Sequence, residues 1–256
     1  MINYHTHTVR CHHGFGTDRE FIEKAIEAGY TEIGFSDHAP CRFPVERPNI
    51  WRMDVEAAGE YVRSLRLLRD EFADRITIHI GFEMEYYPAL FQDMLTCVKE
   101  AGAEYLILGQ HFTKNEYDGG YHTQMPTDDA AILKEYFDQC LEGMRTGCFS
   151  YLAHPDILPF TGSVEVYQSM AAEFLDGLKK INGQIEFNRL GFAEGRSYPR
   201  GEFWEVVARK GVETVIGLDA HRPEVYSDTA TVERMEAALR QYGITPVKPK
   251  LCLLAT

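Results

Sequence analysis

Histidine and acidic residues occur in short groups, each directly after an apolar segment typical of a β-strand. These strand ends read His5-Thr-His7, Asp37-His38, Glu83-Met-Glu85, Gln110-His111, His154-Pro-Asp156, Asn188-Arg189 and Asp219-Ala-His221. Side chains of an extended chain repeat every two residues, so both members of an H-x-H or D-x-H pair point to one side and can meet one ion. Imidazole suits Zn, Mn and Fe, and carboxylates can bridge two ions. The pattern predicts a multinuclear metal site of the kind that performs hydrolysis.

One such group alone is weak support, because a single His or Asp at a strand end is most often a hydrogen-bonded structural residue. Six of the seven strand ends carry a His, an acid or both, and independent structural causes do not explain so many. His79, inside an alternating strand pattern, and His122, in a polar loop, are interpreted as structural. His12 and His13 are adjacent and their side chains diverge, so only one of them is expected to bind a metal.

The elements that must position these residues alternate along the chain as β/α units. Apolar, β-branched runs predict strands at 2–5, 32–36, 76–82, 105–109, 150–153, 184–188 and 214–218. Helical periodicity predicts helices at 18–28, 55–72, 89–100, 128–144, 165–180, 202–210 and 232–242. The first helix has a capping residue in Thr17 or Asp18, an apolar stripe at spacings of three and four, and a stop at Gly29.

Seven β/α units in 256 residues, without a Ser- or Pro-rich linker, predict a single domain over 1–256. The expected fold is α/β, a closed parallel barrel, in which the carboxyl ends of the strands build the active site. An open doubly wound sheet is the alternative. The chain contains neither G-x-G-x-x-G after a strand nor a P-loop, so a nucleotide-binding version of that sheet lacks support.

Composition excludes several other classes of protein. With 45% hydrophobic and 25% charged residues, the chain is an ordinary soluble globular protein. Its net charge of −13 repels polyanions and argues against a nucleic-acid partner. No apolar run approaches the roughly 20 residues of a membrane span, and the first residues lack the features of a signal peptide. The six cysteines form no C-x-x-C pair, which predicts reduced thiols and a cytoplasmic location.

Taken together and in order, the motifs resemble those of the PHP (polymerase and histidinol phosphatase) superfamily, and within it the monofunctional histidinol-phosphatase branch. The matching segments are His5-x-His7 with Cys11-x-His13-Gly14, FSDHAP at 35–40, GFEMEYYP at 81–88, GQHF at 109–112, YLAHPD at 151–156 and GLDAHRPE at 217–224. The resemblance spans nearly the whole chain. The FSDHAP and C-x-H segments favour the histidinol-phosphatase branch over polymerase-associated and exonuclease members.

The resemblance implies a distorted (β/α)7 TIM-like barrel, the PHP fold, with two to three divalent ions (Zn, Mn or Fe). It implies an enzyme that hydrolyses L-histidinol phosphate to L-histidinol and phosphate, a reaction of histidine biosynthesis. One ion would be held by His5, His7, Glu83 and Asp219, a second by Glu83 as a bridge with His111 and His154, and a third by His13, His38 and His221. Asp219 and His221 are also the expected catalytic residues.

A phosphate ester needs cationic side chains to complete its binding site. The candidates for substrate binding are Arg189 and Arg196 after the sixth strand, Arg222 after the last ligand, and Arg42 after the second strand, although each arginine alone is most often a surface residue. The proline-containing connection at 36–53 is longer than an ordinary βα loop and is expected either to cover the site or to be structural.

Three other functions stay open from the sequence. The enzyme could act on another small phosphate ester or on phosphotyrosine, or be an exonuclease, which the net charge disfavours. An alternative of a different class is an inactive metal-binding module. The incomplete ligand shells count against it, because open metal positions have no structural use. The expected partner is a small-molecule phosphate ester, with no nucleic acid and no membrane, and the sequence leaves the oligomeric state undetermined.

Overall fold

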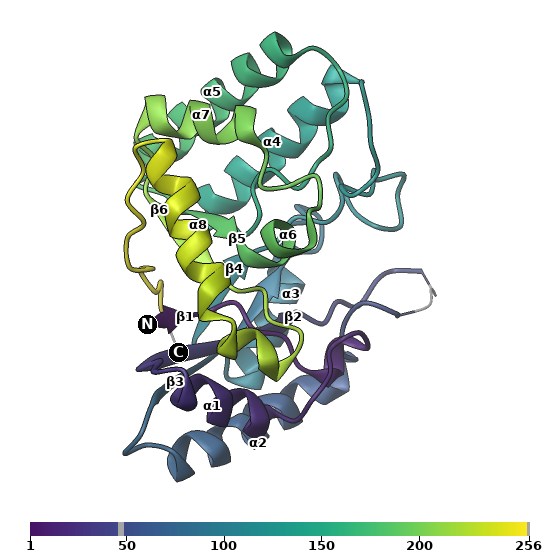
Figure 1. Ribbon diagram of the computed structural model, residues 1–256. Coiled ribbons are helices and arrows are strands. Elements are labelled where there is room, and N and C mark those ends of the chain that lie inside the picture. The colour runs from purple at the N-terminus through teal and green to yellow at the C-terminus, as the bar shows by residue number, and fades with distance from the viewer. Residues whose placement is uncertain (46–48, 255–256) are drawn as a thin grey trace.

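A curled parallel sheet forms the centre of the computed structural model, which describes residues 1–45 and 49–254 (Figure 1). Four parallel strands pair in chain order: β1 (Ile2–Asn3), β2 (Glu32–His38), β3 (Thr77–Met84) and β4 (Tyr105–Leu108). A second parallel pair consists of β5 (Ile185–Asn188) and β6 (Thr214–Gly217). The strands therefore occupy the predicted positions, with one exception at 150–153.

The two groups of strands are connected by backbone hydrogen bonds. Leu152 forms parallel bridges to both Leu108 of β4 and Ile185 of β5, and Thr6 forms one to Ala220. The predicted strand at 150–153 is reduced to the single bridge residue Leu152, because His154 adopts a φ of 31° and turns the chain out of the extended conformation. Parallel pairing thus continues from β4 to β5, and again from the chain after β6 to the chain after β1.

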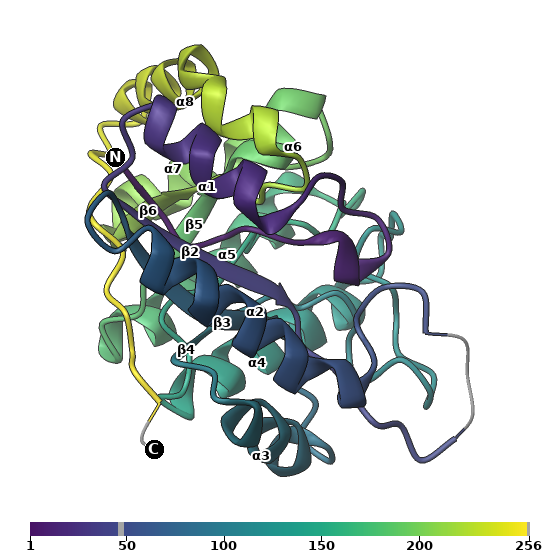
Figure 2. The ribbon, with the colours of Figure 1, turned by 90° about the horizontal axis from the view of Figure 1, so that it is seen from below.

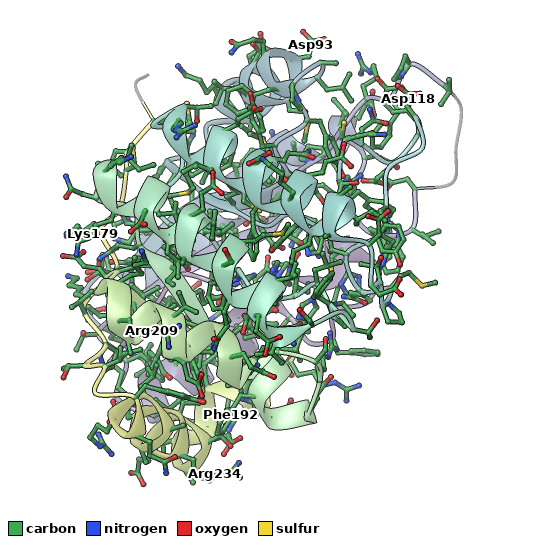
Figure 3. All side chains as sticks on the ribbon, turned by 90° about the horizontal axis from the view of Figure 1, so that it is seen from above. Asp93, Asp118, Lys179, Phe192, Arg209 and Arg234 are labelled. Carbon is green, nitrogen blue, oxygen red and sulfur yellow. The ribbon has the colours of Figure 1, made fainter. Side chains whose placement is uncertain are left out.

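Helices lie around the outside of the strands (Figure 2). They are α1 (Asp18–Glu27), α2 (Ala58–Glu71), α3 (Phe91–Ala101), α4 (Ala130–Arg145), α5 (Val164–Lys180), α6 (Arg189–Glu194), α7 (Gly201–Lys210) and α8 (Thr229–Gln241), with short 3-10 helices η1 (Val9–Cys11), η2 (Val55–Ala57) and η3 (Pro223–Ser227). Exposed polar residues mark the outer surface of these helices, as the labelled Asp93, Lys179, Arg209 and Arg234 show (Figure 3). Seven of the helices lie within a few residues of the predicted ranges.

The first helix forms for the predicted reasons. The Thr17 side chain accepts a hydrogen bond from the backbone N–H of Glu20, whose carboxylate accepts one from the backbone N–H of Thr17, so the helix begins with a capping box. Phe21, Ile22 and Ala25 on its apolar face are buried. Helix α6 was not predicted, because its six residues include a glycine and are too few for a periodic pattern.

Two apolar clusters support the sheet. The large one contains strand residues such as Phe35 together with the buried faces of the helices. The smaller one joins Tyr4, Tyr105, Tyr151 and Val215, from well-separated segments of the curled sheet, so it lies on the concave side. The Tyr105 hydroxyl donates to the backbone oxygen of Tyr4 at 2.8 Å, so this buried hydroxyl has a hydrogen-bond partner.

Within residues 1–45 and 49–254, no helix combines the length and apolar character that a membrane crossing requires.

Candidate metal centre

Side chains from both ends of the chain converge at the carboxyl end of the curled sheet. They are the nine residues predicted as metal ligands: His5, His7, His13, His38, Glu83, His111, His154, Asp219 and His221. Seven of them follow or end a strand or a bridged segment, Glu83 is the next-to-last residue of β3, and His13 follows η1. Their close approach depends on the parallel sheet, because parallel strands all end at the same edge.

The first predicted set is tightly assembled. The Nε2 atoms of His5 and His7 are 3.1 Å apart. Asp219 Oδ1 lies 3.5 Å from the first and 3.2 Å from the second of these nitrogens. The Glu83 carboxylate oxygens lie 3.6 and 3.5 Å from the same two nitrogens. Ligands held at about 2.0–2.2 Å from one tetrahedral zinc ion are separated by roughly 3.3 Å, so these four residues fit one ion.

Glu83 lies between this set and the second predicted set. Its Oε1 is 2.8 Å from Nε2 of His154 and 3.7 Å from Nε2 of His111. A Cβ atom at position 109 would lie 1.9 Å from that oxygen, so only glycine leaves room for the carboxylate. Glu83 is thus placed to bridge two ions.

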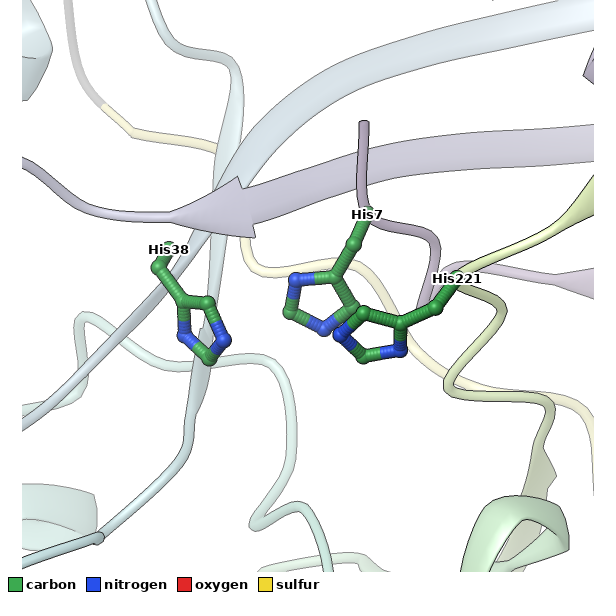
Figure 4. Close-up of side chains that lie close together, drawn as sticks. All are labelled: His7, His38 and His221. Atoms are coloured by element: carbon green, nitrogen blue, oxygen red, sulfur yellow. The ribbon is translucent and has the colours of Figure 1, made fainter. Parts of the chain in front are cut away.

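The third predicted set is looser. The Nε2 atoms of His13 and His221 are 3.0 Å apart, whereas Nδ1 of His38 lies 3.0 Å from the Glu83 carboxylate. Figure 4 shows the rings of His7, His38 and His221 side by side, and the rings of His7 and His221 stack at 4.0 Å between centroids. His7, His38 and His221 each place a nitrogen within 4.8 Å of the others, a spacing that suits a metal ion.

Hydrogen bonds at Nδ1 fix the tautomers of four histidines. Each Nδ1 faces a group that can only accept a hydrogen bond: a glutamate oxygen at 2.8 Å for His5 and 3.1 Å for His111, and a backbone oxygen at 2.7 Å for His13 and 3.1 Å for His221. In the neutral rings their Nε2 atoms therefore carry lone pairs. The lone pairs of His13 and His221 meet at 3.0 Å, which is repulsive unless a cation lies between them. The donor set thus fits transition-metal ions.

The buried carboxylates and histidines of the cluster shift one another's pKa values. Burial alone would raise the pKa values of Glu83 and Asp219, but the surrounding histidines hold both pKa values well below their usual range. Burial, followed by repulsion from His7, lowers the pKa of His38 to about 4. The pKa of His221 is lowered well below its usual value for the same two reasons. The carboxylates are therefore ionised, and His38 and His221 are neutral near pH 7. Against the effect of burial, the same carboxylates raise the pKa of His7 to about 9 and the pKa values of His5 and His111 above their usual value, so a metal ion that binds these three residues must displace protons.

Two buried glutamates hold the proposed ligands from behind. Glu186 Oε1 lies 2.8 Å from Nδ1 of His5, and its Oε2 accepts from the backbone N–H of His154 at 3.0 Å. Glu85 Oε1 lies 3.1 Å from Nδ1 of His111. The sequence analysis noted Glu85 only as a strand-end acid and missed Glu186. The available signal for Glu186 was a carboxylate inside an apolar strand pattern.

The remaining histidines separate clearly in space. His12 is exposed, with a left-handed φ of 67°, while His13 faces His221. His79 lies 2.9 Å from Glu32 in a partly buried pair distant from the cluster. His122 differs from its structural interpretation, because it lines the cavity over the cluster.

A cavity of about 320 Å³ lies over the histidine cluster. Two of the arginines expected to bind substrate, Arg196 and Arg222, line it, and so does Arg52, which the sequence analysis did not name. Arg189 does not line the cavity; its guanidinium donates to Asp228 at 2.6 Å. Arg42 pairs with an exposed glutamate at 3.0 Å on the surface. The structure therefore leaves Arg196 and Arg222 as the phosphate-binding candidates among the four.

The same cavity is bordered by the long connection after β2, since Trp51 and Arg52 line it. Of the prolines in that connection, Pro48 lies outside the described residues.

Comparison with known proteins places this geometry in a family. Residues 3–190 match the PHP domain. A probable histidinol-phosphatase of Deinococcus radiodurans is 26% identical over 231 residues, which are 87% of each chain. The histidinol-phosphatase of Bacillus subtilis is 24% identical over 251 residues, covering 85% of this chain and 92% of that one.

Solved structures share the same fold. A histidinol phosphate phosphatase from Lactococcus lactis, in complex with zinc, L-histidinol and phosphate, superposes with a TM-score of 0.75 at 20% identity and covers 99% of this chain and 98% of its own. A putative histidinol phosphatase from Listeria monocytogenes superposes with a TM-score of 0.71 at 20% identity, covering 91% of this chain and 99% of its own. Because the PHP domain spans most of its length, this chain belongs to the PHP domain family.

Proposed function

We propose that this protein is a metal-dependent phosphomonoesterase that hydrolyses L-histidinol phosphate to L-histidinol and phosphate. The observation that carries the proposal is the convergence of the nine predicted ligands beneath a cavity that two arginines also line. The two curated relatives named histidinol-phosphatase support the choice of substrate. A related structure in complex with L-histidinol and phosphate supports it as well.

The proposed architecture is a single domain over 1–256 that forms a distorted (β/α)7 barrel. In its support, the bridge at Leu152 stands where the fifth of seven strands is expected, and the bridge from Thr6 to Ala220 joins the last strand to the first. All six cysteines are free thiols, which supports a cytoplasmic location. The proposed partner is a small phosphate ester, without nucleic acid or membrane.

The proposed site holds two to three divalent ions, with Zn, Mn and Fe as the candidates. His5, His7, Glu83 and Asp219 would hold the first, Glu83, His111 and His154 the second, and His13, His38 and His221 the third. When bound, such ions neutralise phosphoryl oxygens and acidify water for attack on phosphorus. The short distances within the first set and around Glu83 support two of these positions.

The chain's own residues then orient the substrate and handle protons. Arg196 and Arg222 line the cavity and offer N–H groups to the phosphoryl oxygens. Asp219 is ionised and lines the cavity beside His221, so its carboxylate is placed to accept or hold a proton of the attacking water, while His221 donates from Nδ1 to a backbone oxygen and keeps Nε2 for a metal. Glu186 and Glu85 hold His5 and His111 in the tautomer that leaves Nε2 free.

The test is the rate of phosphate release by metal-replete protein from L-histidinol phosphate, sugar phosphates, a phosphotyrosine peptide and single-stranded DNA. We expect the highest kcat/KM for L-histidinol phosphate. A higher kcat/KM for any other substrate would replace the proposed function.

Arginine variants test the phosphate site in the same assay. Arg196→Met and Arg222→Met should each lower kcat/KM by about 10-fold to 100-fold with full metal content, because each removes a charge-assisted hydrogen bond worth roughly 1.5–3 kcal/mol. Arg189→Met is the matched control, since that side chain pairs with Asp228 outside the cavity. An equal loss in all three variants would contradict the assignment.

A further inference from the structure

Two residues at the cavity wall have no part in the proposed metal site. Trp51 comes from the connection between β2 and α2, and His122 from the connection between β4 and α4. The Trp51 ring lies 6.2 Å from the ring of His13 and 6.1 Å from the ring of His122, measured between centroids. Trp51 therefore lies between His13, at the edge of the metal cluster, and His122.

Trp51 is exposed but held in place. It is 41% exposed, so its ring is accessible to a ligand in the cavity that it lines. The next residue, Arg52, is only 3% exposed and pairs with Glu85 at 2.8 Å and with Glu116 at 2.6 Å. This buried ion-pair network anchors the backbone beside Trp51, so the indole presents a fixed flat wall to the cavity.

His122 supplies a polar group next to that wall. Its Nδ1 accepts a hydrogen bond from the backbone N–H of Gln124 at 3.3 Å, so in the neutral ring the proton is on Nε2. The ring packs edge to face against Phe112 at 4.7 Å, and Phe112 and His122 form an antiparallel bridge that fixes the loop. Within residues 1–45 and 49–254, Nε2 donates to no protein group, so it is free to donate to a ligand.

We propose that Trp51 and His122 form the subsite for the alcohol part of the substrate, and that this subsite takes a flat ring with an acceptor nitrogen. A phosphate bound at the metal cluster places its organic group against Trp51, since the indole neighbours His13. The ring stacks on the indole, and its nitrogen accepts the Nε2–H of His122. This inference rests on the proposed function and adds a reason for selectivity: an imidazole offers both a flat ring to Trp51 and an acceptor nitrogen to His122, whereas a sugar offers an acceptor but no flat aromatic ring.

The experiment measures binding of the two reaction products separately, by calorimetry on the zinc-loaded protein. Trp51→Ala should weaken L-histidinol binding about tenfold or more, and His122→Phe, which keeps a flat ring but removes the donor, about fivefold to tenfold. Binding of inorganic phosphate should change less than twofold in both. Ile50→Ala is the matched control, because Ile50 is exposed in the same loop and does not line the cavity.

Fluorescence gives a second readout. The chain has two tryptophans, and Trp204 is fully buried in the core, so a change caused by L-histidinol comes from Trp51. The change should saturate in the native protein and disappear in Trp51→Phe. Unchanged L-histidinol binding in both variants, or an equal loss of phosphate binding, would overturn the inference.

Failure of the proposed function is a separate result: the native protein would hydrolyse another ester in preference to L-histidinol phosphate. In that case kcat/KM of Trp51→Ala and His122→Phe is measured with the preferred ester. A loss confined to esters of ring-containing alcohols would support the subsite, and equal rates in native and variant proteins would overturn it.

Discussion

Replacement of Glu186 by glutamine tests how the metal site is built. The carboxylate is fully buried and accepts three hydrogen bonds: from Nδ1 of His5 at 2.8 Å, from the backbone N–H of His154 at 3.0 Å and from the Asn188 amide at 2.9 Å. Glutamine has the same shape but only one accepting oxygen. The position of that oxygen decides the outcome.

In the favoured orientation of the glutamine amide, its oxygen accepts the hydrogen bonds from the His154 backbone N–H and the Asn188 amide. The opposite orientation turns the NH2 group toward these two N–H donors and loses about 1 kcal/mol for each bond. In the favoured orientation the NH2 group faces His5, which must accept at Nδ1 and carry its proton on Nε2. A protonated Nε2 cannot bind a metal. Loss of the group that accepts a hydrogen bond from a metal-binding histidine lowers metal affinity by about 10-fold to 100-fold, or about 1.4–2.7 kcal/mol.

The assay is zinc affinity by chelator competition, together with unfolding of the metal-free protein. We expect weaker zinc binding and lower kcat/KM in Glu186→Gln, with the free energy of unfolding of the metal-free protein changed by less than about 1 kcal/mol, because every hydrogen bond has a replacement. Glu213→Gln is the control, since Glu213 pairs with Lys250 outside the cavity. Unchanged zinc affinity in Glu186→Gln would refute the tautomer argument.

Three further predictions follow from the same geometry. Gly109→Ala should reduce the bound metal to one ion or none by elemental analysis, because the new methyl group would lie 1.9 Å from Glu83 Oε1; full metal content would show that the carboxylate can move without loss. Arg52→Met removes the buried guanidinium that pairs with Glu85 and Glu116 and should lower the free energy of unfolding by about 3–5 kcal/mol in urea, and a loss under 1 kcal/mol would be inconsistent with a buried network. His13→Ala should lower metal content and activity together while His12→Ala lowers neither, and the opposite result would place the ligand on the exposed neighbour.

Local spacing in the sequence explains why the residues that meet in the histidine cluster were predictable. His5 and His7 are two residues apart after a strand, and that information is contained in a few consecutive residues. The parallel arrangement of the strands was also predictable, because each helix between them shows its own periodicity. Together these two features anticipated which side chains meet.

The supporting residues depend on distant parts of the chain and were not predictable in the same way. Glu186 is 181 residues from the histidine it contacts, and its one local signal, a carboxylate inside an apolar strand pattern, does not tell which residue it contacts. Arg52, Trp51 and His122 lie in long connections without periodicity, so only the folded structure places them at the cavity. Arg189 follows the strand as the sequence indicates. The direction of its side chain could not be predicted, because α6 begins at this residue and the guanidinium pairs with Asp228.

The most direct test of the central claim is phosphate release from L-histidinol phosphate as zinc or manganese is added back to metal-stripped protein. Metal content per chain is measured on the same samples. We predict no activity in the stripped protein and a rise that reaches its maximum at two to three bound ions per chain. Full activity without metal, or inactivity toward L-histidinol phosphate with the sites filled, would contradict a metal-dependent histidinol phosphatase.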